Sequence, residues 1–255
     1  MAELKFTVKM MGLDDVIRSL SQIKEGAPQA LAKSLTQVAK ATRDAQVETM
    51  RTVFDRPNPF VLNSLYVWSA TPNKLQSSVN VREFAGKGTQ AEKFLGPQIF
   101  GGTRSLKKFE KALQYKGILP KGMYAIPGRG ADFDGYGNMK ASQIVQILSY
   151  FAAFGEQGYR ANTTAAKKAK MKKGTKRVQG FVYFVIPKRV GKLPAGIYKR
   201  SGSAWGSPIK QILVFVKQPS YSKRFDFFEI GEGVMEKEWE AIFAKNIQDA
   251  LDRAK

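Results

Sequence analysis

The first quarter of the chain changes from a strand-like to a helical pattern of hydrophobic positions. Residues 4–10 alternate apolar with polar side chains, which is the period of a half-buried β-strand. Residues 13–23 then place apolar side chains at helical spacing, and a second, longer helix is predicted from Pro28 to about Phe54. Two prolines within residues 55–59 end that helix, because proline disfavours helix in the residue before it.

The middle of the chain is extended at first and then becomes rich in loops. Residues 60–84 are predicted to be extended. The next hundred residues combine Gly- and Pro-rich loops with short helical segments at 90–95, 106–115 and 141–154. Residues 160–178 form a basic low-complexity stretch with too little apolar surface to fold alone.

The last third is predicted to contain strands and one long helix. Apolar runs at residues 181–186, 197–200 and 212–216 indicate strands, and residues 234–251 indicate an amphipathic helix. We expect Trp239, Phe243 and Ile247 to pack that helix on a sheet. The sheet residues expected in this contact are Val182, Phe184, Leu213 and Phe215.

Together these elements predict an α+β fold, with an antiparallel sheet packed against long N-terminal and C-terminal helices and a loop-rich middle insertion. The N-terminal strand is expected to join that sheet. The predicted parts are residues 1–84 (a strand, two helices and an extended segment), 85–178 (a loop-rich helical insertion with the basic tract) and 179–255 (antiparallel strands and the C-terminal helix, completing the core).

Composition excludes most enzyme mechanisms. The chain has no His and no Cys, which excludes Ser-His-Asp chemistry, thiol catalysis and thiolate zinc sites. The longest apolar-rich run, residues 144–154, is too short to span a bilayer, and no signal peptide is recognised. We therefore expect a protein that is no enzyme, with no catalytic, cofactor-binding or metal-binding residues, no cofactor, no small-molecule substrate and no membrane partner.

The net charge of +21 is unevenly distributed along the chain. Residues 157–225 contain 17 basic and no acidic side chains, whereas residues 226–255 contain 4 basic and 8 acidic ones. A block without a single carboxylate cannot neutralise its own charge. We therefore expect nucleic acid, an acidic protein surface or counterions to balance it. A plain solvated basic face is the simplest alternative.

Two short motifs resemble ligand sites but lack essential parts. Residues 132–138 begin with the D-x-D-G pattern of a calcium loop, yet Gln143 stands where the twelfth-position glutamate is needed. Residues 128–130, Gly-Arg-Gly, lack the strand-turn-helix setting of a phosphate-binding loop. Both are interpreted as ordinary turns.

Closely spaced cations in the basic stretch suit a polyanion or an acidic partner. Seven residues form this candidate contact: Lys167, Lys168, Lys170, Lys172, Lys173, Lys176 and Arg177. Such cations neutralise phosphates without sequence preference. Tyr159, Tyr183 and Tyr198 lie nearby in the sequence and could stack on bases. The alternative is a solvated loop that becomes ordered against a neighbouring subunit.

Several stretches resemble the minor tail protein Z and tail-completion (head–tail joining) proteins of tailed bacteriophages. The likeness rests on the opening strand with Gly12-Leu13 and two helices, and on a middle and a C-terminal set of residues. The middle set is Gly101 to Arg104, Lys108 to Leu113, Gly117 to Pro120, Tyr136 to Met139 and Gln143 to Leu148. The C-terminal set is Ile197 to Arg200, Ile212 to Tyr221, Phe243, Asn246 and Ile247.

This resemblance implies a structural virion protein that forms a ring at the phage neck and acts by binding alone. It implies assembly in the host bacterial cytoplasm, with neighbouring neck, portal-adaptor, tail-terminator or tail-tube proteins as partners and packaged DNA as a further candidate. The chain departs from shorter members of the group in its long middle region, residues 85–178. The alternative function is sequence-independent nucleic-acid binding through the basic residues of 160–200.

A subunit contact is also expected from the order of the charges. The basic block is followed directly by a helix that carries Glu229, Glu232, Glu236, Glu238 and Glu240. In a head-to-tail ring each subunit presents different surfaces to its two neighbours, so an acidic helix meeting a basic surface would orient the association. We assign Glu236, Glu238 and Glu240 to this contact. The competing interpretation is that both charge blocks meet within one subunit.

Overall fold

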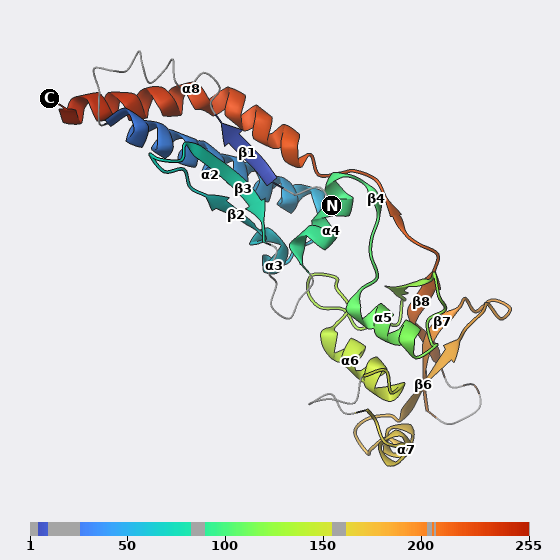
Figure 1. The fold of residues 1–255 in the computed structure, drawn as a ribbon. Helices are drawn as coiled ribbons and strands as arrows, with labels where there is room; N and C mark the ends of the chain where they lie inside the picture. Colours follow the sequence, from blue (N-terminus) through green and yellow to red (C-terminus); the bar gives the residue numbers. More distant parts are fainter. Residues whose placement is uncertain are drawn as a thin grey trace. The chain divides into compact units, whose positions relative to one another are not determined.

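The computed structural model describes residues 5–9, 26–82, 90–154, 162–202, 206 and 208–254 (Figure 1). The chain divides into two compact units, one formed by residues 1–102 with 221–255 and the other by residues 103–220. The helix predicted at residues 13–23 lies outside the described residues, as does Tyr159. No helix in the described ranges is both long and apolar enough to cross a membrane.

The first unit contains a three-stranded antiparallel sheet and two long helices. Its elements are β1 (Lys5–Lys9), α2 (Gly26–Val53), α3 (Pro59–Leu62), β2 (Leu65–Trp68), β3 (Gln76–Val81), α4 (Ala91–Ile99) and α8 (Phe227–Ala254). The strand order is β1-β3-β2. Leu65 lies opposite Val81, and Val79 lies two residues before Val81, so all three point to one face, where they share a buried core with Met50 of α2.

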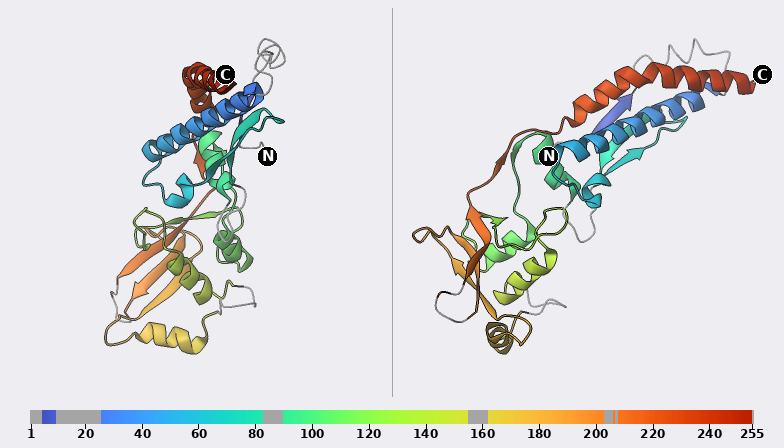
Figure 2. Two further views of the ribbon diagram at one scale, coloured as in Figure 1. Left: turned by 90° about the vertical axis from the view of Figure 1, so that its left-hand side faces the viewer. Right: turned by 180° about the vertical axis from the view of Figure 1, so that it is seen from behind.

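Helices α2 and α8 lie side by side in the first unit (Figure 2). Leu31 and Leu35 of α2 are buried under Met235, Trp239 and Phe243 of α8. The Trp239 and Phe243 rings stack with centroids 5.2 Å apart and planes 12° apart. Two long helices therefore bury their apolar faces against each other.

The second unit is a four-stranded antiparallel sheet with helices on one face. Its elements are α5 (Lys108–Tyr115), β5 (Tyr124–Pro127), α6 (Ala141–Tyr150), α7 (Ala165–Lys173), β6 (Phe181–Ile186), β7 (Gly196–Ser201) and β8 (Ile209–Val216). The strand order is β5-β8-β7-β6. Leu113 of α5 and Ile147 of α6 share a core with Tyr183, Ile197 and Phe215 of the sheet. The two-residue strands β4 (Gly102–Thr103) and β9 (Ser220–Tyr221) pair with each other.

The α+β class, the antiparallel sheets and the two long terminal helices are as predicted. The packing predicted for the C-terminal helix is wrong, because Trp239 and Phe243 contact α2, whereas Leu213 and Phe215 belong to the core of the second unit. The physical reason is that α2 offers a 28-residue helix with buried side chains from Ala27 to Met50, which is a better match in length for α8 than a six-residue strand.

The predicted single sheet and three-part division also differ from the structure. The N-terminal strand pairs with β3, not with the strands of residues 181–216. Strands β6, β7 and β8 follow one another with short connections and can pair among themselves. They complete the unit that begins at residue 103, so residues 85–178 form no part of their own, and α8 returns to the first unit.

Candidate basic binding surface

The basic stretch contains a helix, α7, that the sequence analysis did not predict. The Thr164 hydroxyl caps its N-terminus by accepting a hydrogen bond from the Lys167 N–H at 3.3 Å. Gly174 ends it with a φ of 74°, a conformation that glycine adopts without a steric penalty. The Ala and Lys residues between these two ends are good helix formers.

The start of α7 is fastened to the end of α6. The Thr163 N–H donates to the Ser149 carbonyl at 2.9 Å. The Asn162 side chain exchanges two hydrogen bonds with the backbone of Phe154. The Lys168 ammonium lies 4.9 Å from the centre of the Tyr150 ring, which adds a cation–π contact. The helix thus has a fixed position within its unit, although its own side chains bury little surface.

A tight turn joins α7 to β6. The Thr175 N–H donates to the Val178 carbonyl at 2.9 Å, and the Val178 N–H donates back to the Thr175 hydroxyl at 3.1 Å. Gly180 passes so close to α7 that a Cβ there would lie 2.1 Å from the carbonyl oxygen of Lys172. This turn therefore holds Lys176 and Arg177 in place beside the helix.

Seven cations occupy this helix and turn, which we name the basic ledge: Lys167, Lys168, Lys170, Lys172, Lys173, Lys176 and Arg177. All are exposed except Lys168, which is half-buried. Within the described residues no ion pair joins any of them to a carboxylate. Residues 103–220 hold 23 Lys and Arg but only 4 Asp and Glu, so this unit accounts for +19 of the chain's +21. The structure brings the predicted cations together on one exposed element.

Two of the three tyrosines considered as stacking groups, Tyr183 and Tyr198, are buried. Tyr183 is 4% exposed and its hydroxyl donates to the Gln146 side chain at 2.7 Å. Burial, together with the Asp132 carboxylate, raises the pKa of Tyr183 to about 12. Tyr198 is 2% exposed and donates to the Pro194 carbonyl at 2.7 Å. The proposal that these two rings stack on bases is therefore wrong, because both serve the packing of the sheet.

The two motifs interpreted as turns are built from backbone contacts. The Asp134 carboxylate accepts hydrogen bonds from the N–H groups of Tyr136 and Asn138, both at 2.9 Å, which closes its own loop. Gly128 and Gly130 continue β5 alongside β8, and a Cβ at either would lie within 2.6 Å of β8 atoms. The glycines are required there by close approach of the backbone.

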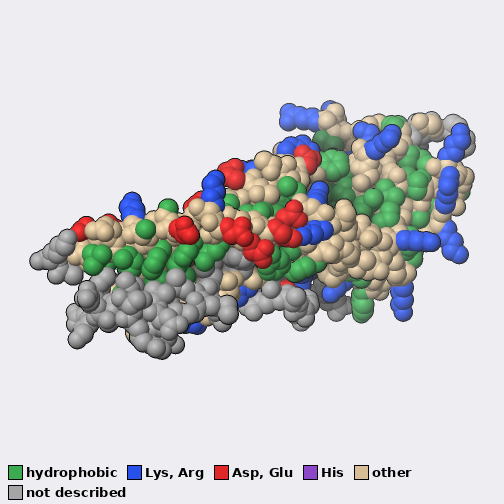
Figure 3. Space-filling view, turned by 90° about the horizontal axis from the view of Figure 1, so that it is seen from above, with side chains coloured by type: hydrophobic (Ala, Val, Ile, Leu, Met, Phe, Trp, Pro, Cys, Tyr) green, Lys and Arg blue, Asp and Glu red, His purple; other side chains and the backbone are tan. Residues whose placement is uncertain are grey.

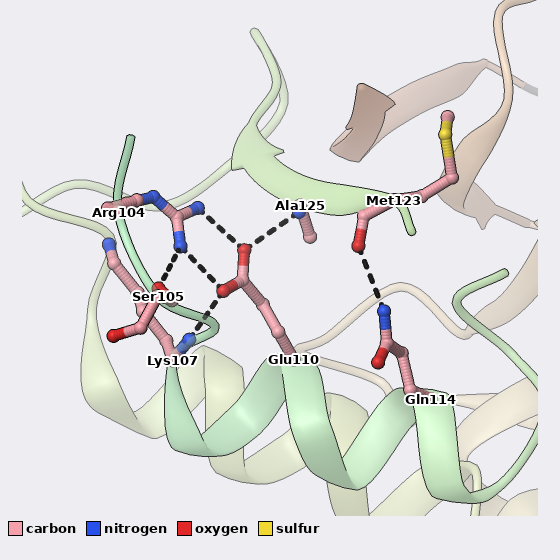
Figure 4. A network of polar contacts seen from close by, with 7 residues as sticks. All are labelled: Arg104, Ser105, Lys107, Glu110, Gln114, Met123 and Ala125. Carbon is pink, nitrogen blue, oxygen red and sulfur yellow. Dashed lines mark hydrogen bonds and ion pairs between the residues drawn. The ribbon is translucent and has the colours of Figure 1, made fainter. Parts of the chain in front are cut away.

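A buried ion pair that the sequence analysis missed anchors the beginning of this unit (Figure 4). Arg104 binds the Glu110 carboxylate through two hydrogen bonds of 2.7 Å, and the same carboxylate accepts from the backbone N–H groups of Lys107 and Ala125. Burial raises the pKa of Glu110, but these hydrogen bonds outweigh it and hold the pKa below its usual value. The pair fixes residues 104–107 to α5 and β5.

The acidic residues assigned to a subunit contact lie on α8 of the first unit, where Figure 3 shows acidic side chains following the helix. Glu236 and Glu240 are exposed and share a stripe with Glu229 and Glu232, at helical spacing. Glu238 is half-buried and points away from this stripe. We name Glu229, Glu232, Glu236 and Glu240 the acidic stripe. Only Glu229 has an ion-pair partner among the described residues, namely Lys223.

No group of three or more metal-ligating side chains lies together in the described part of the chain. What the arrangement can do chemically is bind: a rigid cationic ledge on one unit and an anionic stripe on the other. No family model, curated protein or solved structure was found to match the chain.

Proposed function

We propose that this chain is a structural protein of a tailed-phage virion, a tail-completion or head–tail joining component that acts at the neck as an oligomeric ring. Its work is binding alone, and it is no enzyme. The proposal rests on the resemblance of its Gly-, aromatic- and basic-residue segments to that group. The structural observation that supports it is the separation of charge between two compact units.

A separation of charge between two units suits a protein that connects several different partners. A subunit with one cationic and one partly anionic unit offers two chemically different surfaces, as a member of a head-to-tail ring must. The partners are then further copies, the adjoining neck or tail proteins and the DNA that passes the neck. The location is the virion, after assembly in the host cytoplasm.

Electron microscopy of reconstituted particles tests this function. Purified protein is added to phage heads and tails assembled without it, and the particles are imaged in negative stain and titrated for infectivity. We expect a ring or collar at the neck and recovered infectivity. Particles that gain neither would reject the neck role, whatever the protein does by itself.

The basic ledge supports a second candidate, sequence-independent nucleic-acid binding. Six of its seven cations are exposed, and the helix and turn hold them in place. Replacing Lys167, Lys170, Lys172 and Lys173 by Gln should leave the unfolding midpoint unchanged, since these side chains lie in solvent. Binding to random-sequence duplex DNA should weaken, and the dependence of log K on log salt should become less steep by about 0.9 for each phosphate that the variant no longer neutralises. An unchanged salt dependence would exclude the ledge as the surface that binds DNA.

A further inference from the structure

The four-stranded sheet has one face that no helix covers. Helices α5 and α6 pack on the face that carries Tyr183, Ile197 and Phe215. Side chains alternate along each strand, so the opposite face carries the intervening residues. In the ribbon views, no helix of the second unit lies over it (Figures 1 and 2). This second face we name the open sheet face.

The open sheet face is apolar and partly accessible. Its registered rows include Val182, Phe184, Ile209, Val214, Val216 and Ile126. None of the six belongs to the core on the helix-covered side. Ile126 is 39% and Ile209 is 47% exposed, and the other four are half-buried. Three further residues on this side, Tyr124, Ile186 and Tyr198, are buried. Contiguous apolar surface of this kind is a candidate interaction surface.

Cations border the open sheet face. Arg200 lies on it, in the row between Val182 and Ile209. The β6–β7 hairpin adds Lys188 and Arg189, both exposed. This hairpin stays beside the face because the Tyr198 hydroxyl, which points to the same side, holds the Pro194 carbonyl at 2.7 Å. The surface is therefore apolar in the middle and positive at its border, which suits an acidic amphipathic helix.

The acidic stripe of α8 has the matching chemistry and size. From Glu229 to Glu240 it extends over twelve residues, which is about 16 Å along the axis at 1.5 Å per step. The open sheet face measures about 20 Å along a six-residue strand and about 14 Å across four strands. Half-buried Ile247 continues the line of the stripe two turns beyond Glu240 and adds apolar surface.

We propose that the open sheet face of one copy binds the acidic stripe of α8 in a second copy. The contact is heterologous, because the two surfaces differ, and repeating it gives a closed ring or an open filament. Apolar contact with the sheet supplies most of the affinity, and the charges set the orientation of the helix. This inference rests on the proposed oligomeric role and names the surfaces by which that oligomer forms.

A charge-swap experiment on the full chain tests the contact. One variant carries E232K, E236K and E240K, a second carries K188E, R189E and R200E, and a third carries all six changes. Sedimentation velocity over a concentration series, at low and high salt, measures self-association. We expect each three-site variant to associate about tenfold or more weakly at low salt, and the six-site variant to recover to within about threefold of the wild type. High salt should reduce these differences, because exposed charges are screened.

An apolar variant tests the sheet independently of charge. Ile209→Asp should weaken association at every salt concentration, while its matched control Tyr115→Asp, which replaces a 91% exposed side chain on α5, should associate as the wild type does. Circular dichroism of each variant confirms that the fold is kept.

Four results would overturn the proposal. They are a wild type that stays monomeric, an Ile209→Asp variant that associates normally, a six-site variant that recovers nothing, and charge variants that change the shape of a monomer only. The last result would place the contact inside one subunit. The neck role is judged separately by particle binding, so oligomers that bind no particles reject that role and leave the contact standing.

Discussion

Glu110 carries a buried carboxylate that is held by several hydrogen-bond donors. Its side chain is fully buried, and all of its carboxylate hydrogen bonds come from Arg104 and two backbone N–H groups. Removing one member of such a pair leaves the other charge without compensation in a place that water hardly reaches. Truncating Glu110 therefore lowers the free energy of unfolding by more than the intact ion pair contributes to it.

We expect Glu110→Ala to lower the free energy of unfolding by about 3 kcal/mol. Glu48→Ala is the matched control, since Glu48 also pairs with an arginine, Arg51, but both side chains are more than half exposed. That control should change the free energy by no more than the error of a urea titration. Equal effects of the two substitutions would show that the buried pair is not a structural anchor.

Lowering the pH should remove the contribution of Glu110 to the free energy of unfolding. Its pKa in the folded protein lies below the ordinary value of 4.5, so the folded state holds the carboxylate more strongly than the unfolded chain does. The stabilisation is fully present above the unfolded pKa and is lost as the pH falls through the lower folded pKa. Urea midpoints of the wild type and Glu110→Gln, measured from neutral pH to about pH 3, should therefore converge at the acid end. Parallel curves would contradict this origin.

At the scale of single elements, the hydrophobic pattern predicted the long elements that bury one face but missed the four-residue strand β5. It predicted α2, α8 and strands β6 to β8, because their apolar residues recur at the period of the structure that they form. It missed α7, whose Ala- and Lys-rich sequence has no apolar face and which is held by a cap, a cation–π contact and a tight turn. Contacts of that kind involve single residues and leave no hydrophobic period in the sequence.

The turn after α7 gives a prediction about a single methyl group. Gly180→Ala would place a Cβ 2.1 Å from the Lys172 carbonyl oxygen, which is backbone and cannot rotate away. We expect the basic ledge to detach from β6, with faster amide exchange across residues 165–178 and a lower unfolding midpoint. Gly233→Ala is the control, because a Cβ in that position of α8 meets no atom within 4 Å. Alanine there should stabilise the helix by about 0.5–1 kcal/mol. Normal exchange across α7 in Gly180→Ala would show that the close approach is not needed.

At the scale of the whole molecule, the sequence predicted the fold class but not which elements share a core. Charge is the clearest example: the excess of basic residues in 157–225 is visible in the sequence, yet its extension to residues 103–220 follows only from the unit that they fold into. The same holds for the open sheet face. Val182, Phe184 and Val214 look like core residues in the sequence, and only the position of α5 and α6 shows that these two helices pack on the other side of the sheet.

The connectivity of the two units leads to a final prediction. Residues 103–220 are continuous in sequence and have their own core, built from Leu113, Ile147, Ile197 and Phe215 among others. The first unit is discontinuous, but its two cut ends are near each other, since a Cβ on Gly101 would lie 3.1 Å from the Tyr221 carbonyl oxygen. Each unit should therefore fold without the other.

We expect the fragment 103–220 to unfold cooperatively and to keep dispersed amide resonances. Replacing the same residues by a short Gly-Ser linker should leave α2, α8 and the three-stranded sheet intact, because closing a short loop between neighbouring ends costs little entropy. Circular dichroism melts and amide spectra of both proteins provide the measurement. A fragment with collapsed resonances, or a linker variant that loses its helical signal, would mean that the units stabilise each other. If both proteins fold, they also locate the binding surfaces, since the acidic stripe remains on one and the open sheet face on the other.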